Sequence, residues 1–405
     1  MCINSKLLIF HIKLSIVFSI KISGGLMKIV IASDSFKGSL SSIEIGNICK
    51  EVIMDRYDNA KVVITPMADG GEGTVEAVVL AKKGKMIDCV VKDPLNRDIQ
   101  ASYGIFDDKA IMEMATASGI TLVEDHNRDI FKLNTYGTGQ LILEAINKGI
   151  KDIYIGIGGS ATNDCGIGFS SALGVKYYDI NDNELEPIPL NFKKIERVDV
   201  SNLNPLLKDV NINVICDVNN PLLGEFGATN VFGKQKGASQ KDRVILEEGI
   251  THFINKVETT LNKEVANEKG AGAAGGLGAA LKIFTNSKMT SGIDTILEIT
   301  DLNSVLEDAD LVITGEGRID YQSAFGKVVS GVGKLCKAKN IPCVCIVGSV
   351  GEKSEEMLEY GINAIVPIVD SIMPLEKAIS DAPSLYKSTL NRVLGLLDIN
   401  IHVNK

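Results

Sequence analysis

Four short stretches of the sequence mix glycine and small hydroxyl residues with carboxylates, a combination that phosphate chemistry uses. They are residues 33–39, 67–74, 157–164 and 314–320. Glycine lets backbone N–H groups approach phosphate oxygens, while a nearby carboxylate can bind Mg²⁺ or accept a proton from an attacking hydroxyl. Any single stretch is explained as well by an ordinary turn. Four together, two of them containing a cation (Lys37 and Arg318), favour a phosphoryl-transfer site.

The residues around the first two stretches alternate between apolar runs and helical patterns. A run at 28–32 precedes a helical pattern at 41–56, and a run at 61–66 precedes another at 74–83. This β-α-β-α order predicts a parallel sheet covered by helices. In such sheets ligands bind beyond the carboxyl ends of the strands, where we expect the four stretches to gather.

The middle of the chain has a different pattern, with three strand-like runs and turns within 86–113 that indicate a mixed sheet. The last third alternates again, with strands at 311–314, 343–347 and 364–367 and helices at 326–339, 353–360 and from 384. We therefore predict an α/β protein with two interleaved domains. The chain's two ends (27–85 and 286–405) form a Rossmann-like parallel-sheet domain, and 86–285 form an inserted mixed-sheet α/β domain.

Residues 1–26 are predicted to be a leader or a loose tail. Their apolar stretch, 7–20, is too short to span a membrane and contains His11 and Lys13. The pattern of a globular α/β domain begins at Met27.

Composition and missing motifs exclude several classes of protein. Forty-two Lys and Arg against 51 Asp and Glu give a net charge of −9, which disfavours binding to nucleic acid or a membrane surface. The P-loop pattern fails because Val328 follows Gly326 and Lys327, and the GxGxxG at 270–275 lacks a preceding strand. Eight scattered Cys form no disulfide framework, so we expect a reduced, cytoplasmic chain.

The glycine-rich stretches also carry a family resemblance. Residues 27–397 contain, in order, SDSFKGS, ADGGEGT, YGTGQLI, GIGGSATND, CDVNNPL, VFGKQKGA, GAGAAGGLGAA and ITGEGRID, which resemble the successive motifs of the bacterial type-1 glycerate kinase family. The resemblance implies two α/β domains and ATP-dependent, Mg²⁺-dependent phosphorylation of D-glycerate, commonly to 2-phosphoglycerate. Ser33, Cys165 and Tyr321 stand where this family usually has proline, glycine and glycine. Cys165 and Tyr321 lie beside proposed site residues, so these two departures concern the detail of the pocket rather than the reaction.

This chemistry suggests a role for each candidate residue. Lys37 suits the γ-phosphate, and Asp164 is the first choice for the base that deprotonates the substrate hydroxyl. Arg318, with Arg97 second, is the best-placed guanidinium for the substrate carboxylate. The other candidates are Asp69 and Asp217 as catalytic acids, Ser35, Asn163 and Asp320 for substrate, Gly158, Gly159, Ser160, Gly275, Gly276 and Gly315 for the nucleotide, and Glu316 and Asp320 for Mg²⁺.

Several alternatives stay open from the sequence. Which acid is the base and which binds metal is undecided, and Asp34 is interpreted equally well as a helix cap or a site residue. A non-catalytic sugar-acid sensor or a kinase for another small hydroxy acid would fit the same fold. We expect D-glycerate, ATP and Mg²⁺ as ligands, no nucleic-acid or membrane partner, and a monomer or small homo-oligomer.

Overall fold

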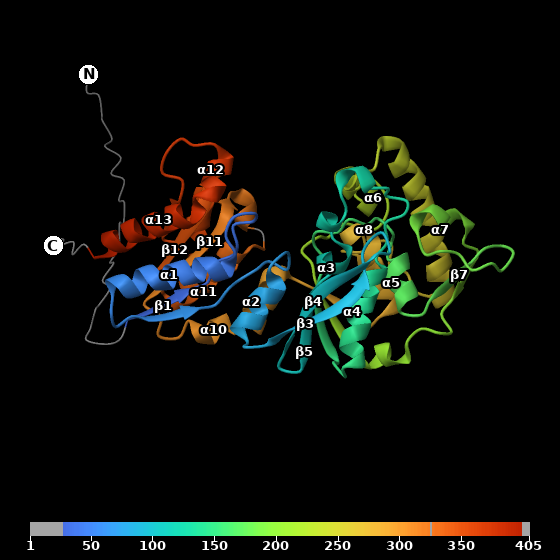
Figure 1. The fold of residues 1–405 in the computed structure, drawn as a ribbon, viewed down its shortest axis with the longest axis horizontal. Coiled ribbons are helices and arrows are strands. Elements are labelled where there is room, and N and C mark those ends of the chain that lie inside the picture. Colours follow the sequence, from blue (N-terminus) through green and yellow to red (C-terminus); the bar gives the residue numbers. More distant parts are fainter. Residues whose placement is uncertain (1–26, 325, 399–405) are drawn as a thin grey trace, which may run out of the picture.

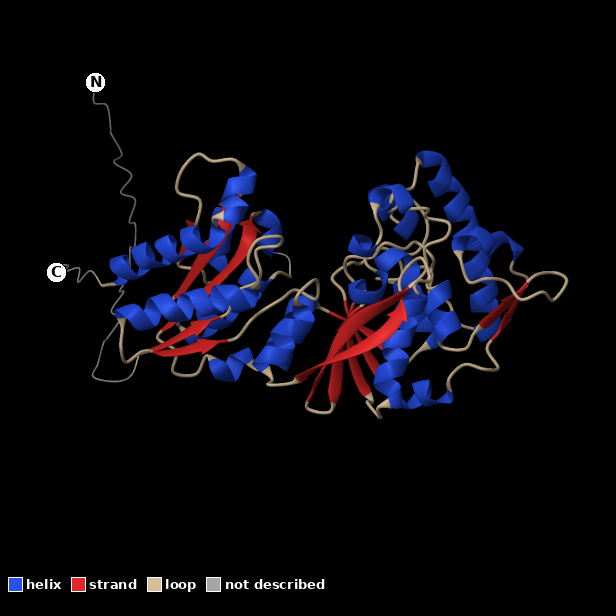
Figure 2. Cartoon of the chain, viewed as in Figure 1, coloured by secondary structure: helices blue, strands red, loops and turns tan. Residues whose placement is uncertain are grey.

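The computed structural model describes residues 27–324 and 326–398, so the leader predicted at 1–26 lies outside the described residues. These residues form two α/β units side by side, each built on its own sheet (Figure 1 and Figure 2). The first unit contains both ends of the described chain, and the second contains its middle. The predicted α/β class is confirmed, and no helix among the described residues is long and apolar enough to cross a membrane.

The first sheet is parallel throughout, in the order β2-β1-β11-β12-β13. Its strands are β1 (Lys28–Ile31), β2 (Lys61–Ile64), β11 (Leu311–Ile319), β12 (Cys343–Val350) and β13 (Ala364–Pro367). From β1 the chain proceeds outward to β2 on one side, while β11, β12 and β13 follow on the other side. The order thus reverses between β1 and β11, and such a switch point leaves a crevice at the carboxyl ends of the strands.

Helices cover both faces of this sheet. They are α1 (Ser42–Arg56), α9 (Gly292–Ile299), α10 (Leu302–Val305), α11 (Val328–Lys339), α12 (Leu375–Ser380) and α13 (Ala382–Leu397). Ile29 and Ile31 of β1 pack with α1 and α13, whereas Val30 packs with α9 and α11. Burial on both faces explains why the strand sequence is continuously apolar. The turn after β1 is fixed at its far end by a capping box, in which Ser41 and Glu44 each accept the other's backbone N–H.

The second sheet is mixed, in the order β10-β9-β6-β5-β4-β3. Its strands are β3 (Lys85–Lys92), β4 (Asp98–Phe106), β5 (Lys109–Glu113), β6 (Asp152–Gly156), β9 (Asn211–Ile215) and β10 (Ser287–Thr290). The first three pair antiparallel as successive hairpins, and β5, β6, β9 and β10 pair parallel. A separate two-stranded ladder joins β7 (Lys176–Tyr178) to β8 (Arg197–Asp199).

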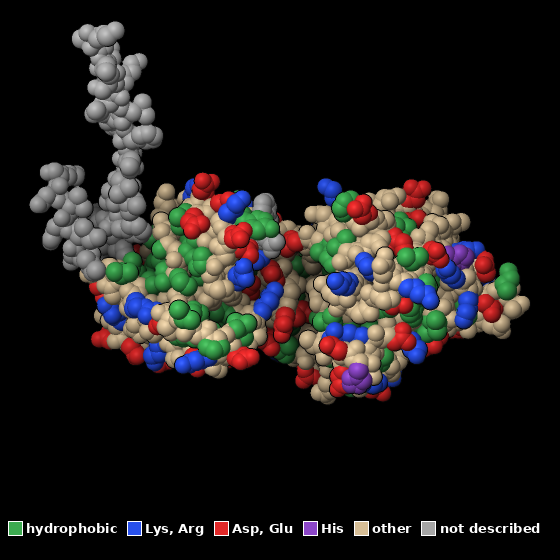
Figure 3. Space-filling model, turned by 90° about the horizontal axis from the view of Figure 1, so that it is seen from above, with side chains coloured by type: hydrophobic (Ala, Val, Ile, Leu, Met, Phe, Trp, Pro, Cys, Tyr) green, Lys and Arg blue, Asp and Glu red, His purple; other side chains and the backbone are tan. Residues whose placement is uncertain are grey.

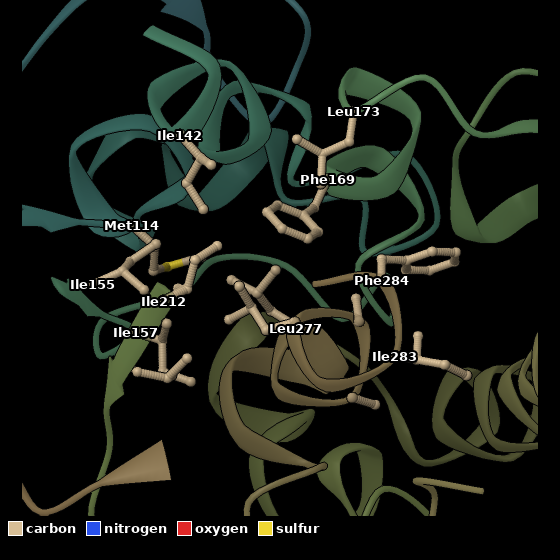
Figure 4. Packing of buried hydrophobic residues seen from close by; sticks show 14 of the residues in the cluster. Met114, Ile142, Ile155, Ile157, Phe169, Leu173, Ile212, Leu277, Ile283 and Phe284 are labelled. Atoms are coloured by element: carbon tan, nitrogen blue, oxygen red, sulfur yellow. The ribbon is translucent and has the colours of Figure 1, made fainter. Parts of the chain in front are cut away.

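The main core of the second unit lies between this sheet and its helices. They are α3 (Ala115–Ser118), α4 (Tyr136–Asn147), α5 (Ile167–Ala172), α6 (Ala228–Phe232), α7 (Gln240–Leu261) and α8 (Ala273–Phe284). Figure 4 shows Ile155 of the sheet, Ile142 of α4, Phe169 of α5 and Leu277 of α8 converging in this core. This packing anchors the start of the 157–164 stretch, because Ile157 is itself part of the cluster.

Helix α2 (Thr74–Ala81) connects the two units. It packs on β4 and β5 of the second sheet, yet its Val75 and Val78 share one apolar cluster with Val30 of the first sheet. The apolar core is therefore continuous across the junction. The domain limits 27–85, 86–285 and 286–405 stay a prediction. In the structure, α2 packs on the second sheet and β10 pairs with β9 of that sheet.

Two segments differ from the sequence-based expectation. The 314–320 stretch was expected to be a loop after a strand ending at 314, but β11 continues to Ile319 and pairs with β12 as far as Val350. Gly315 permits this, because a Cβ there would collide with the Ile346 carbonyl of β12. The helix expected at 353–360 is a 3₁₀ helix over Ser354–Tyr360. Both corrections depend on the neighbouring strand or core, which the local pattern does not contain.

Candidate active site

Asp34 and Glu316 lie at the switch point between β1 and β11. The Asp34 N–H donates to the Gly315 carbonyl over 2.9 Å, which joins the end of β1 to β11. The Asp34 side chain is only 7% exposed, and its Oδ1 accepts the Ser35 N–H over 2.7 Å. Two carboxylates are thereby held at the ligand edge of the first sheet.

Two lysines face the carboxylates of this edge. Lys37 Nζ lies 3.6 Å from Asp69 Oδ2, and Lys327 Nζ lies 3.2 Å from Glu316 Oε2. These groups line a cavity of about 540 Å³ that we call the switch-point cavity, whose charged lining is Asp34, Lys37, Asp69, Glu316, Arg318 and Lys327. Three of the four predicted stretches thus contribute to one cavity.

A second cavity, also of about 540 Å³, lies on the other side of the 35–41 loop, between the two units. Its lining combines that loop with Glu72 and Glu76 from the first part of the chain and with Gln100, Ser102, Glu113 and Thr116 from the second unit. We call it the interdomain cavity. Lys37 and Ser35 line both cavities, so the 35–41 loop is the wall between them. Figure 3 shows acidic side chains along the groove where the units meet.

Burial and the mutual repulsion of the acids shift the charge states at the switch point. Burial raises the pKa of Asp34 to about 7, and Asp69 raises it too, while the Ser35 N–H and Lys37 act in the opposite direction. Burial also raises the pKa of Glu316 against the effect of Ser323 and Lys327. For Lys37, burial lowers the pKa, but Asp69 and Asp34 outweigh it, so the net pKa is raised. The cavity therefore holds a firmly charged ammonium beside a carboxyl that exchanges protons near neutral pH.

The same carboxylates have the chemistry of a magnesium site. Among the residues that the structure describes, Glu316 Oε1 is buried and has no hydrogen-bond partner, while Oε2 faces Lys327. Among residues 27–324 and 326–398, no group of three His, Cys, Asp or Glu side chains is arranged to hold a metal alone. Mg²⁺ usually takes one or two carboxylates together with substrate phosphates. Asp34, Asp69 and Glu316 fit that shared mode and do not form a closed protein cage.

The second unit brings further loops to the junction. A Cβ on Gly70 would collide with Ile215 at the end of β9, and one on Gly156 would collide with the Gly70 carbonyl. The predicted residue Asp217 follows β9, and its Oδ1 accepts the Gly292 N–H over 2.9 Å. Burial raises the pKa of Asp217, as does the charge of Asp69. Asp217 and Asp69 thus face the same junction from different units.

Asp164 does not reach either cavity. It is fully buried, and its carboxylate accepts the Thr135 N–H and hydroxyl over 2.8 and 2.7 Å and the Gly166 and Gly168 N–H groups over 3.2 Å each. Burial raises its pKa in spite of these bonds. A carboxylate with four donors stabilises the joint between the 157–164 stretch and α4.

Three nucleotide candidates of the second unit, Gly275, Gly276 and Ser160, lie in contacts within the fold. Gly275 and Gly276 have φ of +68° and +91° and pack on residues 162–165, where a Cβ would collide with the Thr162 carbonyl or crowd Cys165. Ser160 Oγ and the Thr162 carbonyl accept hydrogen bonds from the buried Lys236 ammonium, over 2.6 and 2.7 Å. Burial lowers the pKa of Lys236 to about 7. Sequence reasoning missed this lysine, although it belongs to the quoted VFGKQKGA motif.

The other predicted residues divide between cavity and surroundings. Asn163 is buried and donates to Thr229, while Gly158 and Gly159 are exposed, with Gly158 close to Gly71. Arg318 lines the switch-point cavity with a side chain that is 69% exposed, and its Nε lies 3.7 Å from Asp320 Oδ2.

Asp320, Arg97 and Lys327 differ in their relation to the two cavities. Asp320 lines neither cavity. Arg97 is paired with the buried Asp93 over 2.6 Å. Sequence reasoning gave Lys327 no role, and its only signal was a Gly-Lys pair after a strand.

A family model, two related proteins and a solved structure that match this chain are all described as glycerate kinases. The model of the family described as "Glycerate kinase family" matches residues 29–398. The chain is 43% identical over 358 residues to a glycerate 2-kinase of Escherichia coli K12, covering 88% of this chain and 94% of that protein. It is 41% identical over 367 residues to a glycerate kinase of Halalkalibacterium halodurans, covering 90% and 97%. A solved structure described as a glycerate kinase 2 from Salmonella typhimurium LT2 matches with a TM-score of 0.82 and 39% identity, covering 92% and 98%.

Proposed function

Because the chain belongs to the glycerate kinase family, we propose that it transfers the γ-phosphoryl group of ATP to D-glycerate, giving 2-phosphoglycerate and ADP. The observation that carries the proposal is the cluster of Asp34, Lys37, Asp69, Glu316 and Lys327 around one cavity at the switch point. Ammonium groups beside carboxylates suit a triphosphate and its metal better than they suit a neutral ligand.

Lys37 is proposed to hold the transferred phosphoryl group. Its ammonium lines both cavities, so it can contact a phosphoryl group at the wall that the 35–41 loop forms between them. The ammonium carries its positive charge before a ligand binds, because the effect of Asp69 and Asp34 on its pKa outweighs that of burial. A preorganised positive charge stabilises the negative charge that spreads over the transferred oxygens.

Asp69 and Glu316 are proposed to hold Mg²⁺ together with the phosphates. The bound ion would supply neutralisation of the triphosphate charge. Glu316 supports this proposal most directly, because its Oε1 is buried with no hydrogen-bond partner in the described part of the chain. Lys327 keeps the other oxygen of Glu316 in place over 3.2 Å.

Asp34 replaces Asp164 as our proposed base. A bond forms between the glycerate C2 oxygen and the γ-phosphorus, the bond from that phosphorus to the ADP oxygen breaks, and the hydroxyl proton passes to a carboxylate oxygen of Asp34. Its pKa of about 7 suits a group that must accept and release a proton at neutral pH. Asp164, with four hydrogen-bond donors on a buried carboxylate, is assigned to folding.

Arg318 is proposed to bind the glycerate carboxylate, since it is a cavity-lining guanidinium whose side chain is largely free of the protein interior. The limits of the two domains, and Ser35 and Asp217 as further site residues, are proposals of the same kind.

The direct test is incubation of the protein with ATP, Mg²⁺ and D-glycerate, followed by phosphorus NMR of the product. We expect one new phosphomonoester resonance with the coupling of 2-phosphoglycerate, together with ADP. A product phosphorylated at the C3 oxygen would change the proposed regiochemistry. Turnover of another hydroxy acid in preference to D-glycerate would change the proposed substrate, and binding without ADP release would indicate a sensor.

A further inference from the structure

The switch-point cavity has a second, apolar end that phosphate chemistry does not use. It is lined by Phe36, Ile368, Val369, Leu375, Ala378 and Ile379. Ile368 and Val369 follow the edge strand β13, and the last three lie on α12, whereas Asp34 and Asp69 follow β1 and β2 at the other side of the sheet. A cavity with cations and carboxylates at one end and aliphatic side chains at the other fits a ligand that is itself divided into a polyanion and a flat apolar group. Its volume of about 540 Å³ lies within the range of small-molecule and cofactor sites.

The apolar end is formed by a segment that is poorly covered by the rest of the protein. Helix α12 has no buried residue, Leu375 is 73% exposed, and Ile379 is 40% exposed. Aliphatic side chains in such a position gain free energy when a ligand covers them. The helix is nevertheless held in place, because the Ser39 hydroxyl donates to the Ile379 carbonyl over 3.1 Å. That bond ties α12 to the same loop that carries Lys37.

The opposite wall at this end is rigid. Phe36 is 4% exposed and its ring packs on Tyr386 of α13 with the ring centroids 5.8 Å apart. Phe36 is adjacent in sequence to Lys37, so one loop supplies both an apolar contact and a phosphate contact. A ligand whose aromatic part and phosphates are joined by a short linker matches this arrangement.

We propose that the apolar end of the switch-point cavity, between Phe36 and α12, is the subsite for the purine base and ribose of the nucleotide. The proposal rests on the proposed function, since it takes the triphosphate to lie by Lys37 and Lys327 at the charged end. It places the nucleotide wholly on the first unit. The glycine-rich stretches of the second unit, which sequence reasoning assigned to the nucleotide, then serve the fold and the junction.

The test compares ligands that share the phosphates but differ in the base. The variant is Leu375→Asn combined with Ile379→Asn, both at exposed positions, and the control is Leu206→Asn, an exposed leucine of the second unit. Calorimetric titration with ADP and with inorganic tripolyphosphate, in the presence of Mg²⁺, measures the two ends separately. Burial of one or two aliphatic side chains predicts about a ten-fold weaker affinity for ADP in the double variant.

The expected pattern is weaker binding of ADP, unchanged binding of tripolyphosphate and an unchanged KM for D-glycerate, with the control like the wild type. Ala378→Phe, which fills the apolar end, should act in the same direction. Unchanged affinity for ADP in both variants would place the base elsewhere and overturn the proposal. If the wild type phosphorylated no hydroxy acid while the double variant still lost affinity for ADP alone, the subsite would stand and the proposed function would fall.

Discussion

Replacement of Asp34 by Asn tests both the electrostatics of the switch point and the assignment of the base. Asn keeps the shape and the acceptor for the Ser35 N–H but cannot ionise. In the folded protein the ionised carboxylate is disfavoured by burial and by the charge of Asp69, which is why its pKa lies near 7 rather than at 3.8. At neutral pH the ionised Asp34 therefore lowers the free energy of unfolding of the wild type, and the variant lacks this destabilisation.

The size of this cost follows from the shift in pKa. Each unit of difference between the unfolded and the folded pKa corresponds to about 1.4 kcal/mol in the free energy of unfolding. Because the folded pKa is the higher one, the folded protein binds more protons than the unfolded chain between 3.8 and about 7, so stability falls as the pH rises through this range. Asp34→Asn should therefore be more stable than the wild type by about 4 kcal/mol near pH 8, by about 1–2 kcal/mol near pH 5, and hardly at all near pH 3.

The measurement is urea unfolding of the wild type, Asp34→Asn and the control Asp108→Asn, whose side chain lies in an exposed turn, at several pH values. The difference for Asp34→Asn should grow with pH and level off above about pH 7. In the same pH series, kcat/KM of the wild type should fall as Asp34 is protonated below its pKa of about 7, and the variant should have little activity at any pH. A stability difference that did not change with pH would refute the account of the buried charge, and near-normal turnover by the variant would pass the role of base to Asp69.

Three further predictions concern the other candidates. Lys37→Ala should lower kcat by roughly 10²–10³ in a steady-state assay while the melting temperature changes little, and Arg318→Ala should mainly raise KM for D-glycerate; normal kcat in Lys37→Ala would leave the 35–41 loop as an ordinary turn. Asp164→Asn replaces one of two accepting oxygens with an NH₂ group, which cannot accept, so calorimetry should find a loss of about 1–3 kcal/mol for each donor left unpaired. A fully stable but inactive variant would contradict the structural role of Asp164. Small-angle scattering should show a decrease in radius when ATP and D-glycerate are added together, because the interdomain cavity must close to exclude water; identical curves would argue against closure.

The fold class was predictable because the relevant signals are local. Continuous apolar runs such as 28–31 predict strands buried on both faces, and burial between α1, α13 and α9, α11 is what the structure has. The start of α1 is likewise determined by nearby residues, because Ser41 caps the helix and forms a capping box with Glu44. Hairpin-like spacing in 86–113 distinguished the mixed sheet from the parallel one, and β3, β4 and β5 lie there.

What the sequence determined about the site was the set of loops and the kind of residues in them; which residues meet was decided by the tertiary structure. Asp164 and Asp34 both follow strands and stand among small residues, yet Asp164 is enclosed by four donors and Asp34 lies beside Asp69 and Lys37 in a cavity. A carboxylate's surroundings come from distant segments, here Thr135 for one and residues 69 and 316 for the other, and so does its pKa. Lys327 lies beside Glu316, which belongs to the part of β11 that extends along β12. That extension depends on pairing between segments about 30 residues apart, which neither segment determines alone.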